Sequence, residues 1–332
     1  MMTGVTKQRT RTPTTTILLD GLGVPECLRW HEGALWFSDM AYGTVHRWTR
    51  ADGVRTVAEI PGRAAGLGWL PDGRLLAVSM DEHRVYRREP DGSLVVHAEL
   101  GESATGPAND MYVDGEGRAY VGNFGFDYHA FVRRQPNSAL YIPPGPPSTS
   151  IVSFAPDGTR LGTSEPLLFP NGCALLADGT LVVAETLGLR LTALRFDETG
   201  VLADARAWAP LAPAPLWRLL NHPGLPGRVT RRISALLDRP AIANRSKSPI
   251  APDGIAAAPD GRTVWVANAL RGECVRVAEG GRVLERVSTS RHTLSCVVGG
   301  EEDSLLFAAT VPSDDPVVAR ELDGGRIETA QL

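Results

Sequence analysis

The sequence predicts an all-β protein, a six-bladed β-propeller with a partly helical insertion, because one strand motif repeats and glycine and proline are abundant. The motif recurs six times along the 332 residues, at spacings that fit propeller blades. The 35 Gly and 25 Pro suit many tight turns between short strands better than long helices. Repeats of about 40 to 50 residues are typical of propeller blades.

The repeated motif is a turn that ends in Gly, a short apolar strand, and a small or polar residue. Its six copies are Gly33–Asp39, Gly73–Ser79, Gly117–Asn123, Gly179–Glu185, Gly261–Asn268 and the weaker Asp303–Thr310. Successive copies begin 40, 44, 62, 82 and 42 residues apart. Three of these spacings match one blade, and the other two match a blade with an insertion of about 20 or about 40 residues.

Each copy is preceded by another predicted strand and followed by an alternating hairpin, which makes four strands per unit. The preceding strands are Glu26–Trp30, Ala65–Trp69, Asn109–Val113, Asn171–Leu175, Asp253–Ala257 and Leu294–Val298. Turn pairs such as Asp52-Gly53 and Asp91-Gly92 mark the hairpins. Six such units around a channel form a propeller, whereas the alternative, an open β-sandwich array, leaves unpaired edges.

The repeat also predicts the domain organisation. We expect residues 1–16 to form a disordered tail and residues 17–332 to form the propeller, with insertions at 128–150 and 211–249. The stretch Thr14–Leu19 is expected to supply an outer strand to the last blade and so close the ring.

Composition and charge exclude several classes of partner. The net charge is −4 and no apolar run approaches the roughly 18 residues of a membrane span, so neither nucleic acid nor membrane is an expected partner. The polar N-terminus lacks the apolar core of a signal peptide, which predicts a cytoplasmic protein. The four cysteines show no close metal-type spacing and are expected to be free thiols. The expected partner is a small-molecule substrate, bound by a monomer or homodimer.

Polar residues recur at one register position, where the first strand of a blade begins. Glu26, Asn109, Asn171 and Asp253 stand there in four blades, and Asp110 follows directly after Asn109. Because the innermost strand of each blade lines the axis, we expect these residues to converge at one end of the channel. Carboxylate and amide oxygens in a confined site are ligands for a hard cation. The alternative for the Asn-Gly and Asp-Gly pairs is ordinary turn chemistry.

The second strand of each blade returns to the same end of the channel and stops at a polar residue. Asn123, Glu185 and Asn268 are therefore candidates for a substrate rim, the alternative being solvated strand ends. His129 and Trp217 lie in the two insertions and are further candidates for substrate contact. The chain contains no G-x-S-x-G elbow, no Walker A loop, no dinucleotide G-x-G-x-x-G motif and no H-E-x-x-H motif.

Several segments resemble the SMP-30/gluconolactonase/regucalcin family. They are Val24–Trp30 with Leu35–Asp39, Gly106–Met111, Tyr120–Asp127, Phe169–Gly172 with Ala184-Glu185, and Pro252–Ile255 with Trp265–Asn268. They occur in family order from about residue 17 to the C-terminus. The resemblance implies one divalent metal ion held by Glu26, Asn171 and Asp253, with Asn109 contacting substrate or a metal-bound water. Many members hydrolyse sugar lactones.

Two features depart from the family pattern and oppose a simple sugar lactone. Pro107 stands where some sugar lactonases have an Arg, and the insertion 211–249 directly precedes Asp253. That insertion has apolar and basic residues at helix-like spacing, for example in Val229–Leu237. Chain connectivity attaches both insertions to the metal-bearing face. We therefore expect a hydrophobic cover over the metal, the alternatives being a dimer interface or a disordered loop.

The leading hypothesis is a divalent-metal-dependent lactonase or ester hydrolase that acts on a relatively apolar or bulky lactone. Asp253 would be both ligand and proton shuttle, and Asn109 would orient substrate or stabilise the oxyanion. The donor set accepts calcium, zinc, magnesium, manganese or iron(II). One alternative is a non-hydrolytic metal-dependent cyclase or isomerase that tailors a secondary metabolite. A second is a non-enzymatic calcium-binding propeller.

Overall fold

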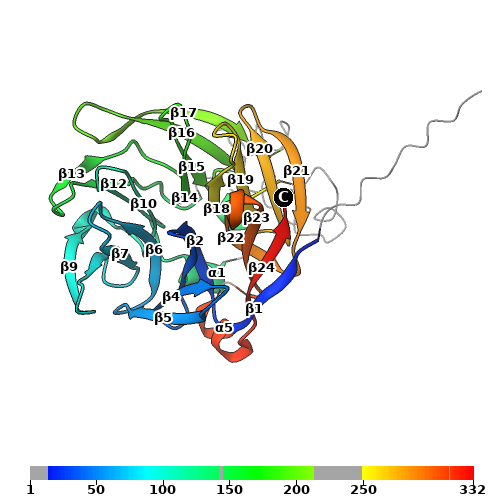
Figure 1. Cartoon of the computed structure of the whole chain (residues 1–332). Coiled ribbons are helices and arrows are strands. Elements are labelled where there is room, and N and C mark those ends of the chain that lie inside the picture. Colours follow the sequence, from blue (N-terminus) through cyan, green and yellow to red (C-terminus); the bar gives the residue numbers. More distant parts are fainter. Residues whose placement is uncertain (1–13, 136, 142–144, 213–248, 314) are drawn as a thin grey trace, which may run out of the picture.

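The fold is a ring of six four-stranded antiparallel sheets, as predicted (Figure 1). The computed structural model describes residues 14–135, 137–141, 145–212, 249–313 and 315–332. Blade 1 contains β2 (Pro25–His31), β3 (Ala34–Asp39), β4 (Thr44–Thr49) and β5 (Gly53–Glu59). Blade 2 contains β6 (Ala64–Trp69), β7 (Leu75–Ser79), β8 (Arg84–Arg88) and β9 (Leu94–Glu99).

The remaining blades follow the same order from the axis outward. Blade 3 contains β10 (Ala108–Val113), β11 (Ala119–Asn123), β12 (Val152–Phe154) and β13 (Arg160–Thr163). Blade 4 contains β14 (Pro170–Leu175), β15 (Leu181–Glu185), β16 (Arg190–Phe196) and β17 (Leu202–Pro210). Blade 5 contains β18 (Pro252–Ala257), β19 (Val264–Asn268), β20 (Glu273–Ala278) and β21 (Arg282–Ser288). Blade 6 contains β22 (His292–Gly299), β23 (Leu305–Val311), β24 (Gly325–Gln331) and β1 (Thr16–Leu22).

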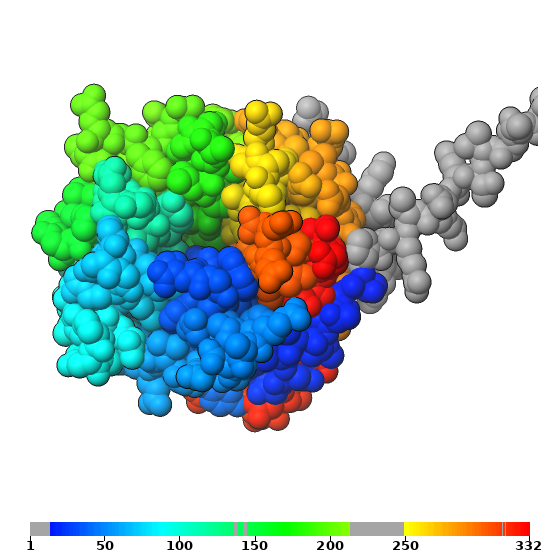
Figure 2. All heavy atoms as spheres, viewed as in Figure 1, coloured from blue at the N-terminus to red at the C-terminus, as the bar shows by residue number. Residues whose placement is uncertain are grey.

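The ring is closed by strands from the two ends of the chain. β1 pairs antiparallel with β24, so the predicted closing strand is confirmed. Thr14 forms a bridge with Ser288 of blade 5, and the Thr15 amide donates to the Ser288 carbonyl at 3.1 Å. Thr14, Thr15 and Thr16, which fall in the predicted tail 1–16, are therefore paired with blades 5 and 6. Figure 2 shows the blades adjoining one another in chain order on one face of the ring.

Every innermost strand carries a β-bulge near the same end. In blade 4 the pairing jumps from Pro170–Glu185 to Cys173–Val183, and in blade 5 from Pro252–Asn268 to Ile255–Val266. Blade 3 has the same jump between Ala108 and Met111. A bulge leaves residues outside the regular ladder and redirects a side chain. The residues released in this way include Asn109, Asn171 and Asp253.

Neighbouring inner strands approach one another closely at the axis. A Cβ atom added to Gly172 would lie 2.4 Å from the backbone nitrogen of Ile255 in the next blade. A Cβ added to Gly66 would lie 2.4 Å from the backbone nitrogen of Met111. Glycine at these bulges therefore serves interblade packing, and Gly172 lies within β14 rather than in the turn that was the alternative for its Asn-Gly pair.

The hydrophobic core is divided among the contacts between neighbouring blades. One cluster joins Leu28 and Phe37 of blade 1 to Phe307 and Ile327 of blade 6. All four cysteines are buried and free, as predicted. No helix in the described part of the chain is long and apolar enough to cross a membrane.

The insertion 128–150 contains a short helix between the second and third strands of blade 3, whereas the helical spacing was predicted in the insertion 211–249. The helix α1 (Tyr128–Arg134) is followed by the 3-10 turn η2 (Asn137–Tyr141). A second helix, α5 (Pro316–Leu322), lies between β23 and β24, and η1 (Gly101–Ser103) and η3 (Glu301–Asp303) are short 3-10 turns. Arg133 of α1 pairs with Asp315 at 2.7 Å, which ties the two helical segments together. Most of the insertion 211–249 lies outside the described residues.

Candidate metal centre

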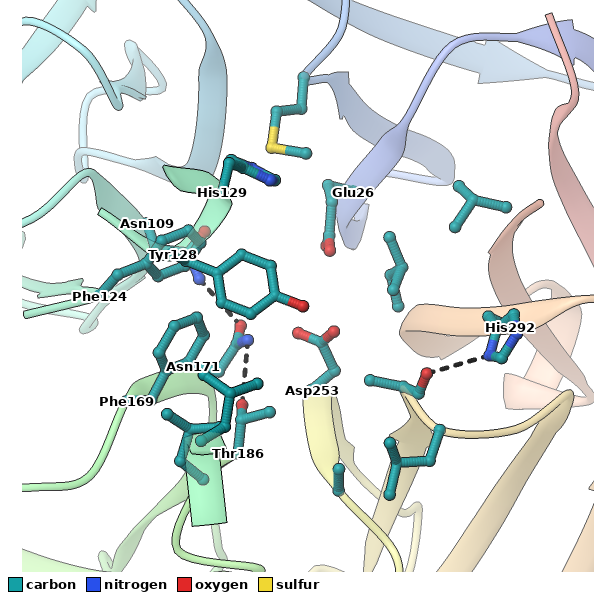
Figure 3. A pocket seen from close by; sticks show the side chains of 18 of the residues that line it. Glu26, Asn109, Phe124, Tyr128, His129, Phe169, Asn171, Thr186, Asp253 and His292 are labelled. Atoms are coloured by element: carbon teal, nitrogen blue, oxygen red, sulfur yellow. Dashed lines mark hydrogen bonds between the residues drawn. The ribbon is translucent and has the colours of Figure 1, made fainter. Parts of the chain in front are cut away.

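The four polar residues predicted to converge do line one cavity, of about 340 Å³. Glu26, Asn109, Asn171 and Asp253 reach it from the inner strands of blades 1, 3, 4 and 5. Asn109, Asn171 and Asp253 are 6–7% exposed, and Glu26 is half-buried. Figure 3 shows the carboxylates of Glu26 and Asp253 and the amide of Asn171 facing a shared space. The bulges explain this convergence, because they turn these side chains toward the axis.

A hydrogen-bond chain orients the amide of Asn171. Thr186 donates its hydroxyl proton to the carbonyl of Pro252 at 2.7 Å, so its oxygen is left as an acceptor. The Nδ2 of Asn171 donates to that oxygen at 3.3 Å. The amide oxygen of Asn171 is thereby the atom that remains for the cavity, where Asn109 Nδ2 donates to it at 3.1 Å. Thr186 thus holds the Asn171 amide with its oxygen, the atom that would bind a cation, toward the cavity.

The backbone beside Glu26 is in an unusual conformation. Cys27 has φ of 53°, in the left-handed region that non-glycine residues rarely adopt. Its amide donates to Glu26 Oε2 at 2.9 Å, which restricts the carboxylate. Burial and the nearby charge of Asp110 raise the pKa of the Cys27 thiol. Cys27 is therefore a neutral buried thiol, in agreement with the prediction of free thiols.

The donor set fits a hard divalent cation. Two carboxylates share the cavity with an amide oxygen, and none of the described residues that line it is Lys or Arg. Like charges in a confined site destabilise each other unless a cation compensates them. Only two of the donors are carboxylates, and among the described residues no group of three His, Cys, Asp or Glu side chains could hold a metal. A metal site in this cavity therefore needs the amide oxygen of Asn171 in addition to the two carboxylates.

The model of the SMP-30/Gluconolactonase/LRE-like region matches residues 24–311. The chain belongs to this family. The match covers blades 1 to 5, the two inner strands of blade 6 and both insertions. Members of the family generally bind a divalent metal ion, which agrees with the donor set described above. No curated protein sequence matches the chain.

Solved structures share the fold of this family member. A luciferin-regenerating enzyme is 16% identical with a TM-score of 0.69, covering 96% of this chain and 95% of that one. A gluconolactonase from Xanthomonas campestris is 20% identical with a TM-score of 0.64, covering 95% and 88%. A calcium-binding regucalcin from Agrobacterium tumefaciens is 18% identical with a TM-score of 0.66, covering 96% of both chains. At these identities the likeness establishes the fold.

Of the other predicted site residues, His129 lines the cavity and is 9% exposed. Asn123 does not line it, because its Oδ1 accepts from the Gly125 amide at 3.0 Å and from the Thr149 hydroxyl at 2.8 Å. These bonds hold the loop after β11. The predicted position of Trp217 falls outside the described residues.

Glu185 and Asn268 are also fully buried and do not line the cavity. Glu185 accepts from the Leu168 amide at 2.8 Å and pairs with Arg190 at 2.6 Å. Asn268 Oδ1 accepts from the Ala251 amide at 3.2 Å. These three strand ends therefore do not form the predicted rim of the cavity. In blades 4 and 5 the side chain at the end of the second strand accepts from a backbone amide in the loop that leads into the first strand. Buried backbone amides need such acceptors.

An aromatic wall that we did not anticipate forms one side of the cavity. The rings of Phe124 and Phe169 stack at 4.2 Å with an interplanar angle of 15°. Tyr128 meets Phe169 edge-on, with ring centroids 5.6 Å apart. Phe169 has φ of 60°, an uncommon conformation for a bulky residue. The sequence signal was present, since Phe124 and Phe169 stand inside the family segments, but nothing there specified that the two rings meet.

Proposed function

We propose that this protein is a divalent-metal-dependent hydrolase of the lactonase type, acting on an apolar or bulky lactone or ester. Membership of the SMP-30/gluconolactonase family supports a lactonase-type enzyme. The observation that carries the proposal is a single cavity lined by Glu26, Asn171 and Asp253 on one side and by Phe124 and Phe169 on another. Hydrophobic walls with a few converging polar groups are typical of small-molecule sites.

Glu26, Asn171 and Asp253 are the residues that would hold the metal ion. When bound, a divalent ion polarises an ester carbonyl and acidifies water. Asp253 accepts the proton of the attacking water, since its carboxylate faces the cavity from the β18 bulge (Figure 3). Asn109 lines the same cavity beside Asn171 and orients the acyl group through its amide.

The lining favours an uncharged, apolar substrate over a sugar. Beyond the aromatic wall, Leu140, Leu187, Leu270, Leu294 and Val311 face the cavity. A sugar lactone carries several hydroxyl groups, and each buried one without a partner costs about 1–3 kcal/mol. An apolar acyl or ring substituent instead gains about 25 cal/mol for every Å² that it buries.

A lactone panel tests this proposal. The purified protein is stripped with a chelator and assayed with calcium, zinc, magnesium, manganese or iron(II) on glucono-δ-lactone and on aliphatic and aryl-substituted γ- and δ-lactones. We expect activity that chelation abolishes and one metal restores, with kcat/KM at least about tenfold higher for the apolar lactones. Asp253→Asn should lose activity, whereas the control Asp178→Asn, an exposed turn residue, should keep it. Full activity after chelation and in Asp253→Asn contradicts the proposal.

A further inference from the structure

The first residue of helix α1 brings a hydroxyl group to the candidate metal centre. Tyr128 lines the same cavity as Glu26, Asn171 and Asp253. Figure 3 shows its hydroxyl pointing into the space beside the Asp253 carboxylate. The metal-ligand candidates all come from the inner strands, at or beside a bulge, whereas Tyr128 comes from the insertion in blade 3. A bound substrate is thus approached by groups from two separate parts of the chain.

The ring of Tyr128 is held in place by its aromatic neighbours. Phe124, Phe126 and Phe169 each meet it edge-on, with ring centroids 6.1, 6.3 and 5.6 Å away and interplanar angles of 69°, 72° and 65°. Edge-to-face contacts of this kind are favourable beyond the area they bury. Three neighbours fix the direction of the ring, and hence the direction of its hydroxyl.

The helix that carries Tyr128 is anchored at both ends. Asp127 caps its first turn by accepting from the Ala130 amide at 2.9 Å. Near its other end, Arg133 makes two hydrogen bonds to the carboxylate of Asp315, at 2.7 and 3.1 Å. The hydroxyl therefore has a fixed position before substrate arrives, which is the condition for efficient proton transfer.

We propose that the Tyr128 hydroxyl is the general acid that protonates the leaving oxygen, an inference that rests on the proposed hydrolase function. Asn109 and the metal-ligand candidates, which act on the acyl group, line the side of the cavity that the inner strands form. In a trigonal ester the leaving oxygen points away from the carbonyl oxygen. With the acyl group against the inner strands, the leaving oxygen faces the insertion, where the hydroxyl of Tyr128 points into the cavity (Figure 3).

The proposed step is balanced in atoms and protons. The oxygen of water forms a bond to the carbonyl carbon and gives a proton to Asp253. The bond between the carbonyl carbon and the leaving oxygen then breaks, and the leaving oxygen takes the bonding pair and the proton of Tyr128. The proton held by Asp253 restores the phenol. One water is consumed, and no oxidant or reductant is needed.

The test uses Tyr128→Phe, which keeps the ring and its aromatic contacts and removes only the hydroxyl. The control is Tyr112→Phe, because Tyr112 of β10 is half-buried and does not line the cavity. The two substrates are δ-nonalactone, whose leaving group is a poor alkoxide, and 4-nitrophenyl butyrate, whose leaving group needs no proton. For Tyr128→Phe we expect kcat on the lactone to fall about 100-fold, the magnitude of general acid catalysis. We expect less than about threefold loss on the nitrophenyl ester, and an unchanged KM.

Four results would overturn the inference. Equal loss on both substrates shows that Tyr128 does not protonate the leaving group, and no loss on either shows that it takes no part. A wild-type protein that hydrolyses neither substrate removes the proposed function, and this inference with it. Thermal unfolding and metal titration of Tyr128→Phe should match the wild type, and a loss of either would make the role of Tyr128 structural. Tyr112→Phe should behave as wild type on both substrates.

Discussion

Replacing Thr186 by valine removes one hydroxyl that connects two of the candidate metal ligands. That hydroxyl accepts from the amide of Asn171 at 3.3 Å and donates at 2.7 Å to the carbonyl of Pro252, the residue before Asp253. Valine has nearly the same shape, so packing is preserved. The substitution leaves one buried donor and one buried acceptor without their partner in this network.

The expected size of the effect follows from these two bonds. Each neutral hydrogen bond contributes about 0.5–1.5 kcal/mol, so Thr186→Val should lower the free energy of unfolding by about 1–3 kcal/mol. The amide of Asn171 is also free to rotate and present its nitrogen to the cavity. Loss of a partner that orients a ligand costs about 10- to 100-fold in metal affinity, or about 1.4–2.8 kcal/mol.

Calorimetric titration of the chelated protein with calcium or manganese measures the affinity, and urea unfolding without metal measures the stability. The control is Ser153→Ala in β12, because the buried Ser153 hydroxyl has no hydrogen-bond partner in the described structure. That variant should bind metal as the wild type does. If Thr186→Val keeps wild-type metal affinity while losing stability, the chain from Thr186 to Asn171 does not orient a metal ligand, and our assignment of the site fails at that point.

Three further predictions concern the site and the ring closure. Asp253→Asn should lower kcat by about 100-fold or more, and Glu26→Gln should chiefly weaken metal binding; kinetics at saturating and limiting metal distinguish the two. Phe124→Leu should raise KM for aryl lactones more than for alkyl lactones, and equal changes would contradict an aromatic contact with substrate. Burial opposes ionisation of Glu328, but hydrogen bonds from Ser290, Thr15 and Thr310 lower its pKa below the usual 4.5. Its contribution to stability should therefore be present above pH 4.5 and be lost as the pH falls through the lowered pKa, so urea unfolding should show Glu328→Gln destabilised at pH 7 and similar to wild type in acid.

The sequence was sufficient for the fold and for the convergence of the polar residues of the inner strands, because both depend on a repeat. A motif that recurs six times fixes the blade count, and equal register places equal positions at the axis. Glu26, Asn171 and Asp253 were therefore brought together as expected. The bulges that turn them inward were not foreseen, since a bulge depends on hydrogen bonds between strands.

The strand-end residues illustrate what a repeat does not specify. Asn123, Glu185 and Asn268 occupy the right end of their strands but turn to the loops. A polar side chain at a strand end can face substrate or cap backbone amides, and buried amides in those loops determine the choice. Tyr128 was missed for a related reason, because its direction depends on rings from two blades.

One register position supplies both kinds of surface that this cavity needs. In blades 1, 3, 4 and 5 it holds polar residues, whereas in blade 6 it holds Leu294, which lines the same cavity. Blade 2 contributes Ala65 at this position, a side chain too short to reach far from its strand. The cavity therefore receives polar groups from four blades at this position and an apolar side chain from blade 6. The six repeated blades thus present different side chains to the cavity, because the residue at this position differs from blade to blade. The insertion in blade 3 adds Tyr128 to these side chains.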